Sequence, residues 1–253
     1  MLGAALQAGS DCEMKQSLKV CWISAGVSSF IAGWLTRESI DRYIYIDIDD
    51  QHPDSMRFIR DCEKVLGKEI EILRSEYGSV ENVARAMGFL NSPYGAPCTD
   101  VLKKRVRKKW EYEHRGYEIT YVWGMDCTEK HRADRLEETM IEFNHEFPLI
   151  EHSLTKQDCH ALLHQLGIKR PAMYDLGYNN NNCIGCAKGG MGYWNKIRVD
   201  FPEVFESRAK LERLIGASFI NGVYLDELEP GRGRIQDEIG VECGIMCYLA
   251  LDE

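Results

Sequence analysis

Hydrophobic and polar positions alternate along the chain with two different periods. Short β-prone runs lie at residues 18–23, 43–48, 70–73 and 119–123. Between and after these runs, apolar residues recur every three or four positions, which is the spacing of an amphipathic helix. Strands that alternate with helices favour a parallel sheet with right-handed crossover connections. The pattern therefore predicts an α/β fold: an open, mostly parallel, twisted sheet flanked by helices.

The predicted helices continue well past the last predicted strand. They lie at residues 30–35, 58–65, 80–87, 99–110, 129–143, 155–166, 171–176, 193–199 and 202–215. From residue 218 the pattern changes, and a β-prone stretch at 219–224 precedes acidic, Gly/Arg and cysteine-containing segments. We expect a loose N-terminal segment (1–16), an α/β domain (17–217) and a C-terminal extension that carries cysteines (218–253).

Composition narrows the class of protein. The 253-residue chain has a net charge of −9, and no apolar run approaches the length of a membrane span, which is roughly 18–20 residues. Residues 1–16 lack the basic start and the apolar block of a secretory signal. We expect no membrane partner and a cytoplasmic location. The sequence does not decide between a monomer and a homodimer.

The cysteines fall into two groups. Ten cysteines in such a chain favour thiolate chemistry or metal binding over disulfides. For Cys12, Cys21, Cys62 and Cys159 we expect ordinary packing, because a thiol buries like a small hydrophobe. The remaining cysteines are candidates for chemistry.

The pair Cys183 and Cys186 forms a C-x-x-C motif in a polar, glycine-rich stretch. Such a pair holds a metal ion or cluster, or forms a redox dithiol. Cys98 stands at the start of the predicted basic helix, where the positive end of the helix stabilises a thiolate. These three thiols are the candidate metal ligands.

A basic run, residues 103–109, stands out from the acidic average. The net charge argues against a protein that coats nucleic acid broadly, although a local patch can still bind it. The run is either a solvated helix face or a site for phosphates or a nucleic-acid strand.

Two turns at predicted strand ends are candidates for nucleotide binding. Residues 24–29 join a strand to a helix, where backbone N–H groups and hydroxyls suit a phosphate; the alternative is a tight connection without a ligand. Asp47 and Asp49 follow the second strand, and ligands of parallel sheets bind at that end, so both acids could face a nucleotide or a cation. Helix capping is the alternative, and it explains Asp54 better than Asp47.

The order of these features resembles the phosphoadenosine phosphosulfate (PAPS) reductase family of PP-loop nucleotide-binding proteins, over roughly residues 18–206. Residues 24–29 look like the PP-loop, and residues 47–54 look like the family's second motif of acid, His, Pro and acid. Gly124 with Glu129 and Arg132 resembles the strand end and the acid–arginine helix that follow. The segment from 147 to the C-x-x-C motif resembles the connection to the cluster, and residues 242–244 (Glu-Cys-Gly) resemble the reductases' catalytic tail.

This resemblance implies an adenine nucleotide α-hydrolase-like fold and a nucleotide substrate: PAPS, adenosine phosphosulfate (APS), or ATP with Mg²⁺. The nucleotide-binding residues it implies are Ser24, Ala25, Gly26, Ser28, Ser29, Asp47, Asp49, Lys103, Gly124 and Arg132. It also implies a [4Fe–4S] cluster on Cys98, Cys183 and Cys186, with Cys243, Cys127 or no residue as fourth ligand. Zinc is the alternative metal, because four thiolates suit it equally.

The resemblance is compatible with three functions. In a sulfonucleotide reductase, Cys243 would attack the substrate sulfur and a thioredoxin-like thiol donor would release sulfite. In an ATP-dependent PP-loop sulfurtransferase that modifies nucleic acid, the run 103–109 would bind the strand. Ser28 stands where the family's PP-loop usually has an acid, and a catalytically silent nucleotide-binding accessory protein is therefore the third function.

Overall fold

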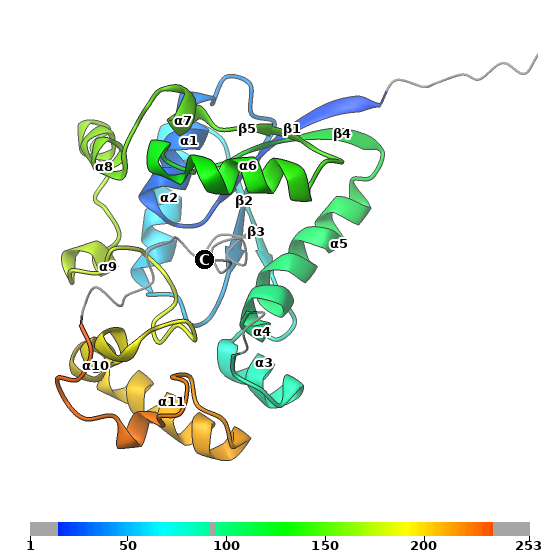
Figure 1. The fold of residues 1–253 in the computed structure, drawn as a ribbon. Coiled ribbons are helices and arrows are strands. Elements are labelled where there is room, and N and C mark those ends of the chain that lie inside the picture. Colours follow the sequence, from blue (N-terminus) through cyan, green and yellow to red (C-terminus); the bar gives the residue numbers. More distant parts are fainter. Residues whose placement is uncertain (1–14, 92–94, 235–253) are drawn as a thin grey trace, which may run out of the picture.

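The computed structural model describes residues 15–91 and 95–234 (Figure 1). Cys12, Cys243 and Cys247 lie outside the described residues. Within the described residues, a five-stranded sheet has the strand order β3-β2-β1-β4-β5, and every neighbouring pair is parallel. The strands are β1 Gln16–Ile23, β2 Arg42–Asp47, β3 Ile70–Arg74, β4 Tyr117–Val122 and β5 Asn144–Glu146. The predicted α/β fold with a parallel sheet is thereby confirmed.

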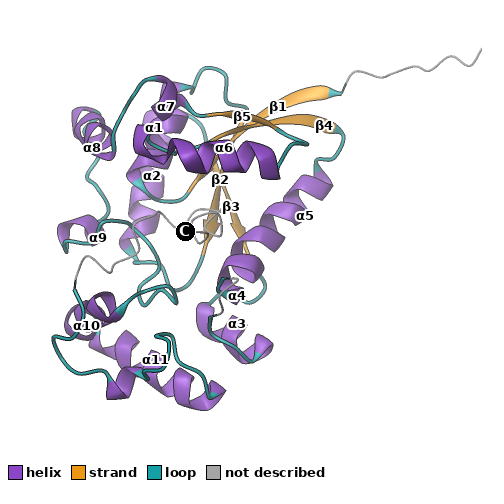
Figure 2. Cartoon of the chain, viewed as in Figure 1, coloured by secondary structure: helices purple, strands orange, loops and turns teal. Residues whose placement is uncertain are grey.

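Helices cover both faces of the sheet (Figure 2). One face carries α1 Val27–Leu35, α2 Asp54–Leu66 and α8 Lys156–Gln165, and the other carries α3 Val80–Met87, α5 Arg105–Glu113 and α6 Lys130–Thr139. Successive side chains of β1 point to opposite faces: Val20 and Trp22 join one apolar cluster, and Cys21 and Ile23 join the other. The strand is therefore buried on both sides, as in doubly covered parallel sheets.

A third apolar cluster lies toward the C-terminal end, low in the view of Figure 1. It is built on α10 Met191–Asp200 and α11 Pro202–Ile215, and Trp194 is its fully buried centre. Residues 219–228 of the predicted extension pack into this cluster. The shorter α-helices are α4 Pro97–Thr99, α7 Pro148–Glu151 and α9 Ala172–Asp175. One π-helical turn, η1, spans Asp100–Lys104, and two 3₁₀ turns are η2 Cys127–Glu129 and η3 Leu225–Glu227.

Two predicted elements are wrong. The helix expected over 129–143 ends at Thr139, and residues 144–146 form the edge strand β5 against β4. The β-prone stretch 219–224 forms no strand of the sheet, and an isolated bridge joins Ile220 to Val223. The carboxylate of buried Glu212 accepts the N–H of Phe219, the first residue of this stretch, and that of Leu225, the residue after it. Side-chain hydrogen bonds thus take the place of strand pairing there.

Among the described residues no helix combines the length and the apolar composition that a membrane span requires.

The strand order places the connections after β1 and β4 at a switch point. From β1 the chain proceeds through β2 to β3 on one side, and β4 and β5 add on the other side. In open parallel sheets, ligands bind outside the carboxyl ends of the strands where the order reverses in this way. Residues 24–29 follow β1 and Gly124 follows β4, so these two predicted nucleotide-binding segments both lie at the switch point.

Candidate nucleotide and thiol site

The loop between β1 and α1, residues 24–29, is held in a tight turn by its own serines. Ser29 Oγ accepts the N–H of Ser24 and donates to a carbonyl of the same turn, each over 3.0 Å. Ala25 has a φ of 60°, a left-handed conformation that is costly for a residue other than glycine. Asn181 Nδ2 donates to the Ala25 carbonyl over 2.9 Å. The segment that precedes the C-x-x-C motif therefore stabilises this strained turn.

Gly124 lies directly against the first turn of α1. A Cβ atom added to Gly124 would stand 2.6 Å from the backbone nitrogen of Ser29. Ser28 and Ser29 are only 4% and 5% exposed, because they pack on this strand end. Gly26 is the N-cap of α1 and has no side chain with which to cap it. The turn thus combines close backbone packing with a helix N-terminus, the geometry that suits a phosphate.

The two acids predicted to face a nucleotide or a cation are paired with Arg74 at the end of β3. Arg74 lies 3.3 Å from Asp47 and also forms an ion pair with Asp49. Gly78 supports Asp49, because its carbonyl accepts the Asp49 N–H and its missing side chain leaves room for the Asp49 carboxylate. No local sequence pattern connects Arg74 with these acids, because their contact depends on the pairing of β2 with β3.

Asp50 connects three separate segments, and no sequence pattern had assigned it a role. Its carboxylate accepts the N–H of Val80 at the start of α3, over 2.6 Å, and forms an ion pair with Arg208 of α11. Its carbonyl accepts the N–H of Ile184, between the two cysteines of the C-x-x-C motif, over 2.8 Å. Arg208 is 4% exposed, and this buried carboxylate explains an arginine at that depth. The end of β2 therefore fixes the position of the thiol loop.

The three predicted thiol ligands line one cavity. Cys98, Cys183 and Cys186 surround a volume of about 20 Å³ together with Lys103, at the start of α3 and of the η1 turn. Cys183 and Cys186 are each 6% exposed, and Cys98 is half-buried. Residues 85 positions apart in the sequence thus meet at the carboxyl edge of the sheet. The structure brings together the thiols that the sequence had grouped by resemblance.

Tyr193 holds the loop between the paired thiols. Its hydroxyl accepts the N–H of Cys186 over 2.9 Å and donates to the carbonyl of Cys183 over 3.2 Å. Gly189 makes this contact possible, because an added Cβ would lie 2.6 Å from Cε1 of the Tyr193 ring and closer still to Cδ1. Gly185 supplies the left-handed turn, with a φ of 70°. The glycine-rich character of the motif is therefore explained by the approach of one tyrosine ring and by one turn.

The basic run is solvated over only part of its length. Lys103 and Arg107 are 6% and 5% exposed, whereas Arg105, Lys108 and Lys109 are exposed. The π-helical turn η1 precedes α5 at this point, and such turns are frequent at functional sites. Lys103 lines the thiol cavity, and its positive charge favours the thiolate form of a neighbouring cysteine.

The three thiols of the cavity suit a metal bound by thiolates, and the volume of the cavity suits a small ligand. Thiolates are the ligands of zinc and of iron–sulfur clusters. About 20 Å³ is space for roughly one water molecule, so a four-iron cluster would require the loops to move apart. Within residues 15–91 and 95–234, no group of three or more His, Cys, Asp or Glu side chains is arranged as a metal site. Cys243, the further ligand candidate, lies outside these residues.

Arg132, predicted to bind nucleotide, is buried on α6 and is 7% exposed. Its guanidinium forms an ion pair with Glu129, and its Nε has no hydrogen-bond partner among the described residues. A buried donor without an acceptor is costly. A bound anion would supply an acceptor for this group.

The cysteines expected to be core residues behave as predicted where they are described. Cys21 and Cys62 are fully buried, and burial raises the pKa of Cys21 to about 12 and that of Cys62 well above its usual range. Cys159 is also buried, on α8. The thiols of Cys21 and Cys62 therefore stay protonated at neutral pH and are poor nucleophiles.

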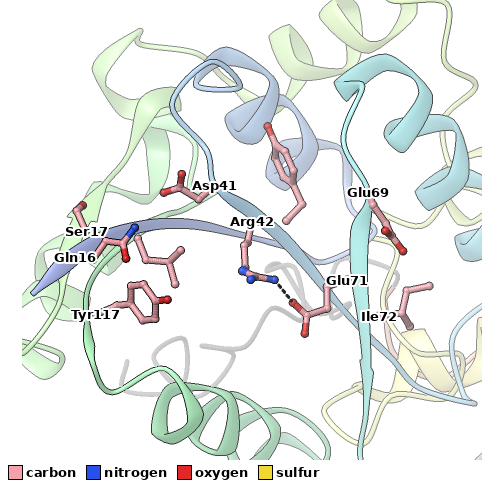
Figure 3. Close-up of a pocket in the computed structure, with 10 residues that line it drawn as sticks. Gln16, Ser17, Asp41, Arg42, Glu69, Glu71, Ile72 and Tyr117 are labelled. Carbon is pink, nitrogen blue, oxygen red and sulfur yellow. Dashed lines mark ion pairs between the residues drawn. The ribbon is translucent and has the colours of Figure 1, made fainter.

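A wider hollow lies at the opposite, amino-terminal end of the sheet (Figure 3). It measures about 550 Å³ and is lined by the starts of β1 to β4. Arg42 and Glu71 face each other in it at 3.7 Å, with Asp41 and Glu69 nearby. None of the predicted site residues lines this hollow. The candidate chemistry therefore lies at the other end, where the strands point.

Fold and site together describe an α/β protein with a parallel sheet, a tight turn after β1 and a cavity lined by three cysteines near the end of β2. No protein-family model matches the chain, and no match was found among curated proteins.

Proposed function

We propose that the protein binds an adenine nucleotide at the carboxyl edge of its sheet and carries out sulfur chemistry there, as a PAPS-reductase-like enzyme that releases sulfite from a sulfonucleotide. The observation that carries the proposal is the cavity shared by Cys98, Cys183, Cys186 and Lys103. The segment that forms it also holds the residue 24–29 loop, through the contact between Asn181 and Ala25. A nucleotide on the loop would therefore extend beside the thiols.

The proposed reaction has two displacement steps. In the first, the Cys243 thiolate attacks the sulfur of the sulfonucleotide, the bond from sulfur to the phosphate oxygen breaks, and the nucleotide leaves with the electron pair. In the second, one thiol of a thioredoxin-like dithiol attacks Cys243 Sγ of the resulting S-sulfocysteine, so that sulfite leaves and a mixed disulfide forms. The donor's other thiol then attacks this mixed disulfide, which regenerates the Cys243 thiol and leaves the donor oxidised to its disulfide.

Described residues would bind the charged substrate. The N-terminus of α1 would hold one phosphate, Lys103 would neutralise charge beside the thiols, and the unpartnered Nε of Arg132 would donate to an anionic oxygen. Asp47 and Asp49 would reach the nucleotide only by exchanging their contacts with Arg74. A thiolate-bound metal held by Cys98, Cys183 and Cys186 would add positive charge near the substrate sulfur.

Sulfite release tests this function directly. We expect the full chain to release sulfite from APS or PAPS with reduced thioredoxin, and Cys243→Ser to abolish that release. Cys62→Ala is the control, because Cys62 is a buried core thiol on α2 and lies outside the thiol cavity. Full sulfite release by Cys243→Ser would rule out the proposed mechanism.

Metal analysis tests the cofactor. Anaerobic protein that holds an iron–sulfur cluster absorbs at about 400 nm and contains iron and sulfide, whereas zinc gives a colourless protein. We expect the bound metal to decrease in Cys98→Ala and in Cys183→Ala and to remain in Cys62→Ala. Equal metal content in all three variants would exclude the cavity as the metal site.

A second candidate, an ATP-dependent sulfurtransferase acting on nucleic acid, is favoured by the charge next to the cavity. Arg105, Lys108 and Lys109 are exposed there. The pKa of Lys104 is lowered, mainly by burial. The positive charges of Arg107, Lys108 and Lys188 lower it further, and the negative charge of Asp100 opposes them. Such concentrated positive charge suits a phosphate backbone.

Pyrophosphate release from ATP that requires added RNA or DNA would support this candidate. Nucleotide binding without any turnover would indicate the silent accessory protein.

A further inference from the structure

The residue 24–29 loop has no charge of its own to offer a phosphate. It contains three serines, and the first turn of α1 has no charged residue. A helix N-terminus contributes only about half a unit of positive charge. A nucleotide with several phosphate charges would need a side-chain cation close to this loop.

Two sets of contacts place Lys156, the first residue of α8, beside this loop. Lys156 Nζ donates to Asn180 Oδ1, and the next residue, Asn181, donates to the Ala25 carbonyl within the loop over 2.9 Å. Lys156 Nζ also lies 5.8 Å from the centre of the Tyr174 ring. The Tyr174 hydroxyl in turn accepts the N–H of Val27, the first residue of α1, over 3.5 Å. Lys156 is thus linked to the loop through Asn180 and Asn181 on one route and through Tyr174 alone on the other.

The positive charge of Lys156 has no carboxylate partner among the residues that the structure describes. Lys130, the first residue of α6, holds the position in its helix that Lys156 holds in α8. Lys130 forms an ion pair with Asp134, four residues later, at 3.0 Å. The corresponding residue after Lys156 is His160, whose pKa is lowered by burial and then by the charge of Lys156. Asp158 is engaged with Thr155, whose N–H and hydroxyl it accepts.

Lys156 is also unfavourably placed with respect to its own helix. A cation at a helix N-terminus faces the positive end of the helix dipole. A half-buried lysine in that position, next to a neutral histidine, is stabilised by an anion that the described residues do not supply.

A second, independent observation at the loop also points to a ligand. Asn181 is 5% exposed, and its Nδ2 donates to Ala25 and to Ser55 Oγ, while its Oδ1 has no hydrogen-bond partner within the described ranges. An unpartnered buried acceptor of this kind is rare in folded proteins. A hydroxyl or amino group of a nucleoside would satisfy it.

We propose that Lys156 binds the phosphate groups of a nucleotide seated on the residue 24–29 loop, and that Asn181 accepts a hydrogen bond from the same ligand. This inference rests on the proposed nucleotide function and extends it to residues that sequence reasoning had not selected. Lys156 exchanges the neutral Asn180 oxygen for a phosphate oxygen when the ligand arrives. The ligand is therefore recognised by its negative charge as well as by a hydroxyl or amino group of its nucleoside.

Equilibrium binding of ATP, APS, PAPS and adenosine to the full chain tests this inference. A charged hydrogen bond contributes about 1.5–3 kcal/mol, so Lys156→Ala should weaken binding of the phosphate-bearing ligands about 10- to 100-fold. Adenosine binding should be unchanged, and Lys156→Arg should retain most of the affinity for ATP. Lys210→Ala is the matched control, because it removes one charge from an exposed position of α11. Thermal unfolding of each variant establishes that it is folded.

Each outcome has a defined meaning. If the wild type binds ATP, APS or PAPS and Lys156→Ala binds it equally tightly, the Lys156 inference is overturned and the proposed function stands. If Lys156→Ala weakens adenosine binding as much as ATP binding, Lys156 is a structural residue and the inference is again overturned. If the wild type binds none of the phosphate-bearing ligands, both the inference and the proposed function are overturned.

Discussion

Tyr193 stabilises the loop between Cys183 and Cys186 with a single hydroxyl group. That hydroxyl satisfies one backbone donor and one backbone acceptor of the loop. Burial, and next the nearby Cys186, hold the pKa of Tyr193 well above its usual range, so the hydroxyl stays protonated. The backbone of the C-x-x-C loop is therefore held by a side chain ten residues after Cys183.

We expect Tyr193→Phe to destabilise the protein by about 1–3 kcal/mol, because a buried N–H loses its acceptor. The free energy of unfolding in urea measures this effect. Tyr112→Phe is the control, since Tyr112 is 67% exposed and its hydroxyl reaches solvent. Equal stability of the two variants would show that the loop does not depend on this hydroxyl.

His145 illustrates how burial decides the protonation of one residue. Trp123 Nε1 donates to His145 Nδ1 over 3.0 Å, which leaves Nε2 to donate to the Met140 carbonyl at 3.0 Å. Burial lowers the pKa of His145 below its ordinary value of 6.5. A proton on His145 Nδ1 would face the N–H of Trp123, which is also a donor. The folded state therefore retains the neutral imidazole.

The sign of the resulting pH effect follows from linkage. The folded protein binds this proton less readily than the unfolded chain does, so the contribution of His145 is present above about pH 6.5 and is lost as the pH falls below it. We expect the free energy of unfolding to decrease more between pH 7 and pH 5.5 in the wild type than in His145→Gln, because glutamine keeps a donor and an acceptor but does not titrate. Parallel pH profiles of the two proteins would contradict this assignment.

At the scale of elements, the contact between the end of β4 and the start of α1 has no spare room. Gly124 is required there by contact rather than by backbone conformation, because its missing Cβ leaves space for the backbone of Ser28 and Ser29. The close packing sets the position of the α1 N-terminus relative to the sheet. Any phosphate bound at that terminus depends on it.

We expect Gly124→Ala to destabilise the protein by about 1–3 kcal/mol through overpacking and to weaken nucleotide binding, because the loop must shift. Thermal unfolding and equilibrium binding of ATP measure the two effects. Gly116→Ala is a matched control at the other end of the same strand, where an added Cβ meets nothing within 4 Å. Similar behaviour of both variants would show that the contact is not restrictive.

At the scale of the whole molecule, the ion pair between Asp50 and Arg208 joins the C-terminal cluster to the sheet. Arg208 is on α11 and Asp50 follows β2, 158 positions earlier. Since Asp50 also binds the start of α3 and the C-x-x-C loop, one residue relates three segments to one another. The hollow of about 370 Å³ beside it is lined by residues of the β2 end, the C-x-x-C loop and α11.

We expect Arg208→Met to destabilise the protein by about 3–5 kcal/mol, because removing one partner leaves a buried charge uncompensated. Arg208→Met combined with Asp50→Asn should recover some of this loss. Arg213→Met is the control on the same helix: its partners Asp226 and Glu227 are exposed, and exposed ion pairs contribute little. Urea unfolding measures all three variants, and equal effects of the two single substitutions would refute the role of the Asp50 pair.

The sequence by itself determined the alternation of strands and helices, the parallel sheet and most element positions. Predicted helices 80–87 and 202–215 coincide with α3 and α11, and Thr155 caps α8 as expected. Apolar periodicity and capping act between residues a few positions apart, so they can be read from the chain. The edge strand β5 was missed because its Asn-His-Glu sequence has no apolar alternation.

Only the tertiary structure decided which polar residues meet. It placed Cys98 beside Cys183 and paired Asp47 and Asp49 with Arg74. It also buried two basic residues of the run 103–109, Lys103 and Arg107. It also brought Lys156 and Asn181 to the loop after β1. Contacts between residues far apart in the chain depend on the strand order and on the packing of helices across the sheet. No local pattern encodes these distances, because a side chain's partner is set by where its element docks.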